Sequence, residues 1–254
     1  MPRKEDNVPA TLRAMAVLEA LVAAERPPSL ADLTLTLRLP KPTLYRMLGM
    51  LEGAGLVARE PGARRYAPGP RLAALGRAAL LNGGLRAERH AILARLVDAI
   101  GETCNFTMLD GDAVVYLDRV EAAWPLRMTL SSGSRVPLHC SASGKLLLAM
   151  LPKTSRARLI THLALTRYTE TTITEARRLE AELARIRAEK YATDNEEFHA
   201  GLVCVSVPVT DARKRVCAAI AVHAPASRMP LAKALEHLPS LRRAAASLAK
   251  TFLD

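Results

Sequence analysis

Residues 29–69 read SLADLTLTLRLPKPTLYRMLGMLEGAGLVAREPGARRYAPG and contain two short helical patterns followed by a basic hairpin. Ser29 is typical of a helix N-cap, and leucines at helical spacing follow it as far as Leu37. The pattern breaks at Pro40, and apolar residues then return at helical spacing until Gly53. A helix, a short turn and a second helix predict a helix-turn-helix.

The residues after the second helical pattern alternate like a two-stranded hairpin, with LVARE and RRYAP on either side of Pro61 and Gly62. Arg59, Arg64 and Arg65 are expected to stay exposed on this hairpin, where cations contact DNA phosphates. An ordinary helical hairpin with a solvated charged face would also give the two helices, but it leaves the basic hairpin unexplained. The pattern therefore favours a winged helix-turn-helix.

The second helix carries the residues expected to contact DNA. Lys41, Thr43, Tyr45 and Arg46 face away from its apolar seam, and the second helix of this motif enters the major groove. Arg46 is the best candidate for reading a base, because an arginine side chain binds guanine through two hydrogen bonds. Ser29 and the three arginines of the hairpin complete the predicted DNA-binding set.

Composition agrees with a nucleic-acid partner. The 254 residues carry a formal net charge of +11, which favours polyanions without indicating a fold. Only 4% of the residues are aromatic, which argues against stacking on single-stranded nucleic acid. No uninterrupted apolar run is long enough to cross a bilayer, so no membrane partner is expected. The first residues lack the apolar core of a signal peptide, so a cytoplasmic location is expected.

The rest of the chain predicts a second domain. A helix at 11–24, with Leu12, Met15, Leu18 and Leu21 or Val22 on one face, would complete the core around the helix-turn-helix. A helix at 70–81, rich in Ala and Leu, would connect two domains and pack against its copy in a second subunit. Further helices are predicted at 86–100, 143–151, 174–190 and 239–252, and strands at 104–109, 113–120, 126–130, 202–210 and 216–223. Helices and strands mixed around one sheet predict an α+β sensing domain.

Four segments give the chain a resemblance to the IclR-type bacterial transcriptional regulators over essentially its whole length. They are SLADL…LPKPTLYRMLGMLEGAGLV, GDAVVYLDRVEA, RMTLSSGSRVPLHCSASGKLLLAM and YATDNEEFHAGLVCVSVPV, in the expected order. The resemblance implies a winged helix-turn-helix DNA-binding domain at 1–69, a linker helix at 70–85 and a GAF-like effector-binding domain at 86–254. It also implies a regulator without enzymatic activity or cofactor, assembled as homodimers that often pair into homotetramers.

The segment VPLHCSASGKLLLAM has a physical interpretation of its own. A Ser/Gly turn before an apolar helix leaves the backbone N–H groups of Ala142, Ser143 and Gly144 free to bind a carboxylate, which the helix dipole also favours. A phosphate-binding loop is excluded, because His139 and Leu146 occupy the positions that need Gly and Ser or Thr. A Ser–Lys hydrolase would need SxxK, but Ser141 lies four residues before Lys145 and Ser143 only two. A capped helix start without ligand remains an alternative to the effector site that the resemblance implies.

The resemblance also implies the other residues of an effector pocket, namely Met128, Val136, Asp194, Leu202, Cys204, Ala221 and His223. Ala221 and His223 stand where the small-keto-acid sensors of the family carry hydroxyl groups, which suggests a different anion or a larger acid. His223 is alternatively a hydrogen-bonded core residue, and Asp194 a strand-end cap. Beside an anion, Asp194 would be repulsive, so we expect it to contact a ligand hydroxyl or a water molecule.

These observations predict a transcriptional regulator that binds a double-stranded DNA operator and responds to a small organic acid, with a keto acid and an aromatic acid as the candidates. A general architectural nucleic-acid-binding protein would explain the charge, but not the second domain. A metal sensor is a further alternative, but no two of its candidate ligands have a spacing typical of a zinc site. These candidates are His139, Cys140, His199, Cys204, Cys217 and His223. Four cysteines without a CxxC pair are expected to be thiols.

Overall fold

The computed structural model describes residues 8–24, 26–60, 64–82, 85–124 and 132–252. The chain divides into two compact units, Met1–Leu80 and Leu81–Asp254. Each unit has its own core, and the division falls within a single helix, α4 (Pro70–Asn82).

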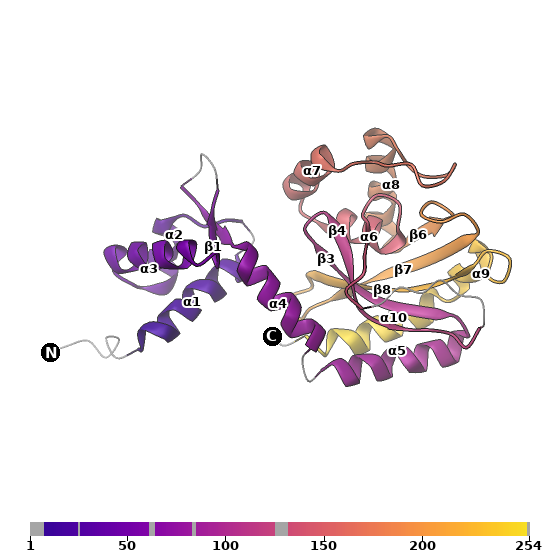
Figure 1. Cartoon of the computed structure of the whole chain (residues 1–254), viewed down its shortest axis with the longest axis horizontal. Helices are drawn as coiled ribbons and strands as arrows, with labels where there is room; N and C mark the ends of the chain where they lie inside the picture. The colour runs from indigo at the N-terminus through magenta and orange to yellow at the C-terminus, as the bar shows by residue number, and fades with distance from the viewer. Residues whose placement is uncertain (1–7, 25, 61–63, 83–84, 125–131, 253–254) are drawn as a thin grey trace. The chain divides into compact units, whose positions relative to one another are not determined.

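The first unit is a winged helix-turn-helix (Figure 1). Its elements are α1 (Ala10–Ala23), α2 (Leu30–Leu37), α3 (Lys41–Gly53) and a two-stranded antiparallel sheet of β1 (Val57–Arg59) and β2 (Tyr66–Pro68), followed by the start of α4. Ser29 caps α2 with a capping box: its hydroxyl accepts a hydrogen bond from the Asp32 N–H at 3.2 Å, and the Asp32 carboxylate accepts one from the Ser29 N–H at 2.8 Å. The predicted helix-turn-helix and its N-cap are therefore confirmed.

The face that α1 buries agrees with the predicted one only in part, because Leu18 and Leu21 are buried as predicted while other predicted residues are exposed. The core of this unit is built by Val17, Leu18, Leu21, Leu33, Leu44, Met47, Leu48, Val57 and Tyr66. Leu12 and Met15, which were expected in it, are 58% and 49% exposed, and Val22 is 58% exposed. Apolar residues lie on two adjacent stripes of this helix, so periodicity alone did not distinguish the buried stripe from the exposed one.

Gly69 holds the wing against the end of the helix-turn-helix. A Cβ at this position would lie 2.3 Å from the carbonyl oxygen of Gly55, so no larger residue fits. The Gly69 N–H donates to the Leu56 carbonyl at 2.8 Å, which ties the start of α4 to the wing. The close approach therefore fixes where β2 ends.

The second unit contains a six-stranded antiparallel sheet in the order β5-β4-β3-β8-β7-β6. Its strands are β3 (Thr103–Asp110), β4 (Ala113–Val120), β5 (Arg135–Pro137), β6 (Ala192–Asn195), β7 (Leu202–Thr210) and β8 (Val216–Pro225). Its helices are α5 (Arg86–Ile100), α6 (Ala142–Met150), α7 (Lys153–His162), α8 (Ala176–Glu189), α9 (Leu231–Glu236) and α10 (Leu238–Ala249). The strand predicted at 126–130 lies outside the described residues, while β5, β6, α7 and α9 were not predicted.

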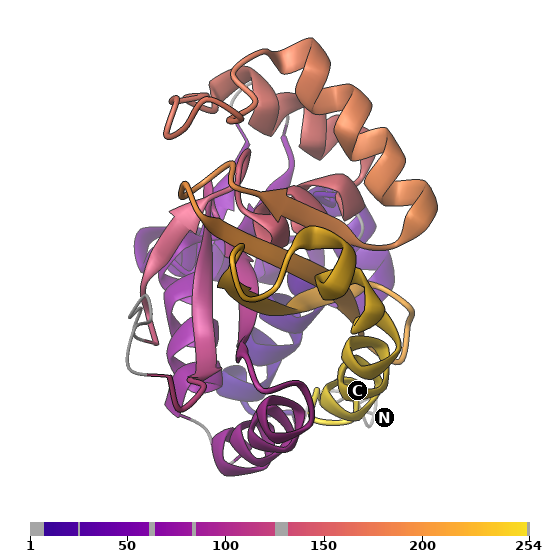
Figure 2. The ribbon, with the colours of Figure 1, turned by 90° about the vertical axis from the view of Figure 1, so that its right-hand side faces the viewer.

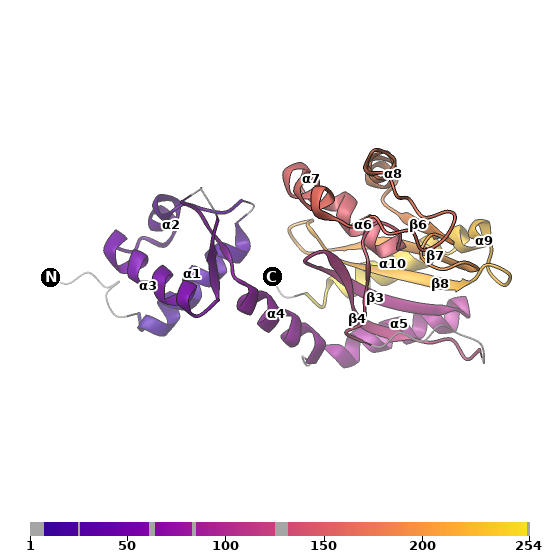
Figure 3. The same ribbon diagram turned by 45° about the horizontal axis from the view of Figure 1, so that its top comes forward.

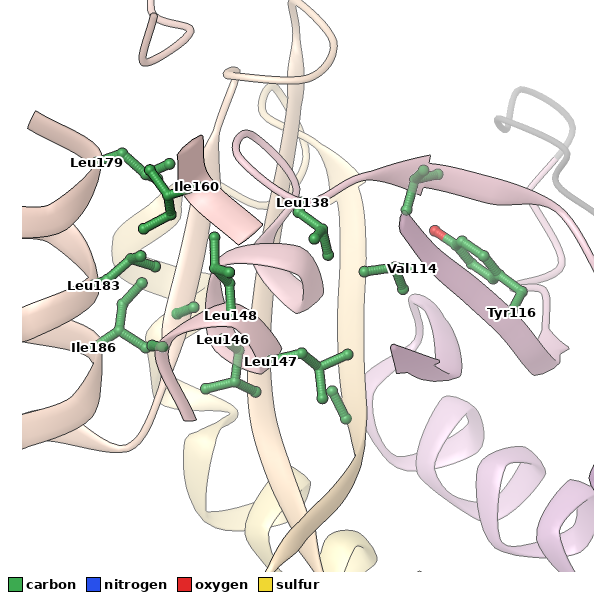
Figure 4. Packing of buried hydrophobic residues seen from close by; sticks show 14 residues of the cluster. Val114, Tyr116, Leu138, Leu146, Leu147, Leu148, Ile160, Leu179, Leu183 and Ile186 are labelled. Carbon is green, nitrogen blue, oxygen red and sulfur yellow. The ribbon is translucent and has the colours of Figure 1, made fainter. Parts of the chain in front are cut away.

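Helices cover both faces of this sheet (Figure 2 and Figure 3). On one face, α5 packs against β3 and β4, where His90 contacts Asp118, and α10 packs against β7 and β8. On the other face, α6 is joined to β7 by a hydrogen bond between Ser143 and Ser206, and α8 packs on α6. Figure 4 shows the leucines of α6 between the sheet and α8. This arrangement places the start of α6 over the middle of the sheet.

None of the helices among the described residues combines the length and apolar character needed to span a bilayer.

Candidate DNA-binding surface and effector cavity

The predicted recognition residues lie in the first half of α3, outside its buried stripe. Lys41, Tyr45 and Arg46 are exposed and Thr43 is half-buried. Within this stripe, Leu44, Met47 and Leu48 anchor α3 in the core. Because the anchoring side is apolar and the outer side carries cations, α3 can enter a groove of DNA without losing its packing.

The three arginines of the wing have different environments. Arg64 is exposed. Arg59 lies 3.3 Å from the Glu52 carboxylate and 5.3 Å from the centre of the Tyr66 ring, so part of its charge is compensated. Arg64 is therefore the wing cation best placed to meet a phosphate.

The expectation that Arg65 stays exposed is wrong. Arg65 is half-buried, and its guanidinium donates a hydrogen bond to the Pro27 carbonyl at 2.9 Å. An antiparallel bridge between Ser29 and Arg65 brings the residue before β2 beside the start of α2. The Ser29 hydroxyl is likewise engaged in its helix cap.

A cavity lies between the start of α6, the sheet and the loop after β6. About 30 Å³ of it admits the centre of a water molecule, and the space outside the protein atoms, open solvent included, is about 410 Å³. Seven predicted pocket residues line it: Val136, Ala142, Ser143, Asp194, Leu202, Cys204 and His223. Four others were not predicted: Asn105, Tyr116, Ser141 and Phe198. Gly144 and Ala221 are buried nearby without lining it, and Met128 lies outside the described residues.

The start of α6 offers two of the three predicted donors. Within the described part of the chain, the N–H groups of Ala142 and Ser143 have no hydrogen-bond partner. The N–H of Gly144 was also expected to be free, but it donates to the Ser141 hydroxyl at 3.2 Å, because Ser141 is the N-cap. Gly144 serves packing instead, since a Cβ there would lie 2.6 Å from the backbone of Leu138.

Asp194 combines the two roles that its sequence position left open. Its side chain is a cap, because Oδ1 accepts hydrogen bonds from the N–H groups of Glu197 at 2.7 Å and Phe198 at 3.2 Å. It also lines the cavity while only 3% exposed. Burial, together with the negative charge of Glu197, raises the pKa of Asp194 to about 7.

His223 brings an unsatisfied nitrogen to the cavity. Its side chain is buried, and its Nε2 atom has no hydrogen-bond partner among the residues that the structure describes. Burial and the nearby positive charge of Arg119 lower the pKa of His223 to about 3, so the ring is neutral. The alternative of a fully hydrogen-bonded core histidine does not hold for this nitrogen.

The sheet register explains the unpredicted neighbours. Asn105 stands opposite both Arg119 and Ala221, so the three side chains share the cavity face of the sheet. A bulge in the pairing of β3 with β4 brings Tyr116 to the same face. Six consecutive residues of β4 are buried, so both of its faces are covered, and the apolar pattern of the sequence does not reveal where the bulge lies.

The candidate metal ligands do not converge. Among the described residues, no group of three or more His, Cys, Asp or Glu side chains is placed to hold a metal ion. His139 donates to the Thr166 carbonyl at 2.9 Å, and burial raises the pKa of Cys140 and of Cys204, which keeps both thiols protonated.

Two family models match the chain. The IclR helix-turn-helix domain matches residues 10–61, and the C-terminal domain described as bacterial transcriptional regulator IclR C-terminal matches residues 77–250. Together they cover both compact units.

Individual relatives agree with these matches. A probable transcriptional regulator, SauR, from Cupriavidus necator is 50% identical over 96% of this chain and 97% of its own length. The crystal structure of the Thermotoga maritima IclR has a TM-score of 0.63 and 29% identity, covering 94% of this chain and 97% of that one. The inducer-binding domain of a double mutant of PobR from Acinetobacter, in complex with 3-hydroxybenzoic acid, has a TM-score of 0.60 and 26% identity, covering 66% of this chain and 98% of that one.

Proposed function

The chain belongs to the IclR family of bacterial transcriptional regulators, and we propose that it binds an operator as a dimer or tetramer whose affinity for DNA is set by a small organic acid. It is thus a regulator rather than an enzyme. The observation that carries the effector part of the proposal is the buried cavity with free N–H donors at the start of α6. Its DNA target places the protein in the bacterial cytoplasm.

The DNA-binding part of the proposal assigns α3 to the major groove. Arg46 contacts a base edge, Lys41 and Thr43 contact the flanking backbone, and Arg64 on the wing contacts a phosphate. The exposure of these side chains supports the assignment. Tyr45 rests on the sugar-phosphate backbone.

A dimer is proposed because one winged domain makes too few DNA contacts by itself. A single domain neutralises few phosphates, whereas a two-fold pair doubles the contacts and reads a pseudo-palindrome. The exposed apolar stripe of α1, formed by Leu12, Met15 and Val22, supports such an interface. The exposed Leu75 and neighbouring alanines of α4 offer a second one.

The effector is placed with its carboxylate on the N–H groups of Ala142 and Ser143. These donors stabilise an anion by hydrogen bonding, so no full positive charge is needed in the core. His223 and Cys204 meet its far end, and Val136, Leu202 and Phe198 form apolar walls. Only about 30 Å³ of this cavity admits the centre of a water molecule, which favours a small acid.

Replacing Ala142 by proline tests this placement, because it removes one donor and fills part of the cavity. Ser141 has φ −88° and ψ 146°, an extended conformation that precedes proline well, so α6 should still form. We expect acids that stabilise the wild type in a thermal-shift screen to bind Ala142→Pro at least tenfold more weakly by calorimetry, roughly the loss of one charge-assisted hydrogen bond.

The matched control is Lys153→Pro, at the exposed first residue of α7 outside the cavity. It should bind the same acids as tightly as the wild type. An acid that alters operator affinity and binds Ala142→Pro without loss would place the effector elsewhere.

A further inference from the structure

The cations around Asp194 form ion pairs with other carboxylates. Lys145, buried on α6, contacts Glu197 in an ion pair and lies 3.7 Å from Glu182 on α8. Glu182 is also bound by Arg185 at 2.8 Å. Among the described residues no cation forms an ion pair with Asp194, whose two hydrogen bonds are to backbone N–H groups on Oδ1. The ionised carboxylate therefore has no counter-charge of its own.

Four further side chains that face Asp194 are neutral near pH 7, so none of them supplies a counter-charge. Burial raises the pKa of Tyr116 on β4, of Cys140 before α6 and of Cys204 on β7, which keeps all three neutral. Burial keeps His223 on β8 neutral by lowering its pKa.

Arg119 is the cation on the same sheet face. Its guanidinium is buried and lies 3.3 Å from the Glu121 carboxylate, so its charge is paired. An organic anion at the start of α6 would thus enter a cavity that already holds one uncompensated carboxylate, and two such charges in a buried space are strongly unfavourable.

Resting on the proposed function, we propose that the effector anion is taken up together with one proton, which resides on Oδ2 of Asp194. Oδ2 has no hydrogen-bond partner in the described part of the chain, so the carboxylic acid is free to donate to the ligand. The proton comes from solvent and no other bond changes. A carboxylic acid at this place selects ligands that carry an acceptor oxygen there, such as a keto group or a second carboxylate. An ionised Asp194 would instead select a ligand that carries a hydroxyl group at this place.

The raised pKa of Asp194, at about 7 in the free protein, supports this inference. A bound anion raises it further. Above pH 7, the affinity for the anion should therefore fall by about tenfold for each pH unit, because the proton must be taken from solvent.

The test is calorimetry on the full chain between pH 6.5 and 8.5, with 2-oxobutanoate, malonate and 3-hydroxybenzoate as probes. Two cationic buffers with different enthalpies of ionisation, Tris and imidazole, report the protons taken up. The wild type should take up close to one proton at pH 8.5 and bind at least tenfold more weakly there than at pH 6.5. Asp194→Asn, whose amide donates like the acid, should take up none and bind with the same affinity at both pH values.

Asp98→Asn is the matched control, because Asp98 is an exposed carboxylate on α5, and it should behave as the wild type. The carbon NMR signal of the Asp194 carboxyl, identified by its absence in Asp194→Asn, should move to the protonated position on binding. A probe that binds the wild type equally at both pH values without proton uptake would overturn the inference while leaving the proposed function intact. If no probe binds either protein at any pH, the proposed function fails for small acids, and the inference fails with it.

Discussion

Lys145→Met is expected to lower the free energy of unfolding by about 3–5 kcal/mol, the usual cost of removing one partner from a buried ion pair. Lys145 is 1% exposed and pairs with Glu197, which is itself buried. Without the ammonium group, Glu197 must be buried as an unpaired carboxylate or take up a proton. Urea denaturation of the second unit, followed by circular dichroism, measures the loss.

Two variants separate the charge effect from a packing effect. Adding Glu197→Gln to Lys145→Met removes the orphaned charge and should recover most of the lost stability. Lys153→Met, at an exposed lysine on α7, should stay within about 0.5 kcal/mol of the wild type. If Lys145→Met were as stable as this control, the ion pair would not be holding α6 to the loop after β6.

Arg46→Ala should reduce affinity for the specific operator by about 1–3 kcal/mol, which is roughly 5–150-fold, and leave binding to random DNA much less affected. The reason is that Arg46 is proposed to read a base. Fluorescence anisotropy with operator and scrambled duplexes at one salt concentration measures both affinities.

Arg64→Ala is the comparison, because a phosphate contact carries no sequence information. It should weaken operator and scrambled DNA alike and lower the dependence on salt by about one phosphate. Equal losses on the two duplexes for Arg46→Ala would remove Arg46 from base reading.

The first unit shows where sequence patterns suffice. In α3 the apolar residues at helical spacing form one stripe, and the residues that the structure buries, Leu44, Met47 and Leu48, lie on it. In α1 two stripes compete, and the neighbouring helices decide which one is buried. Arg65 was misjudged for a related reason: its bond to Pro27 joins residues that are distant in sequence, and nothing local indicates it.

The residues of the cavity likewise fall into those that a local sequence signal predicts and those that depend on the whole sheet. The Ser/Gly start of α6 is a local signal, and its donors at Ala142 and Ser143 were predicted. Its N-cap, Ser141, takes the third donor, because the cap starts one residue earlier than expected. Asn105 and Tyr116 reach the cavity through strand pairing and a bulge, and these depend on the whole sheet.

The most direct test of the account is ligand-dependent, sequence-specific DNA binding by the purified chain. Genomic fragments selected by the protein would be measured by anisotropy against scrambled duplexes, with and without an acid that shifts its melting temperature. We predict a two-fold symmetric site bound roughly a thousandfold or more above scrambled DNA, with an affinity that the acid changes at least fivefold in the wild type but not in Ala142→Pro. Equal affinity for selected and scrambled duplexes, or an affinity that no bound acid alters, would contradict it.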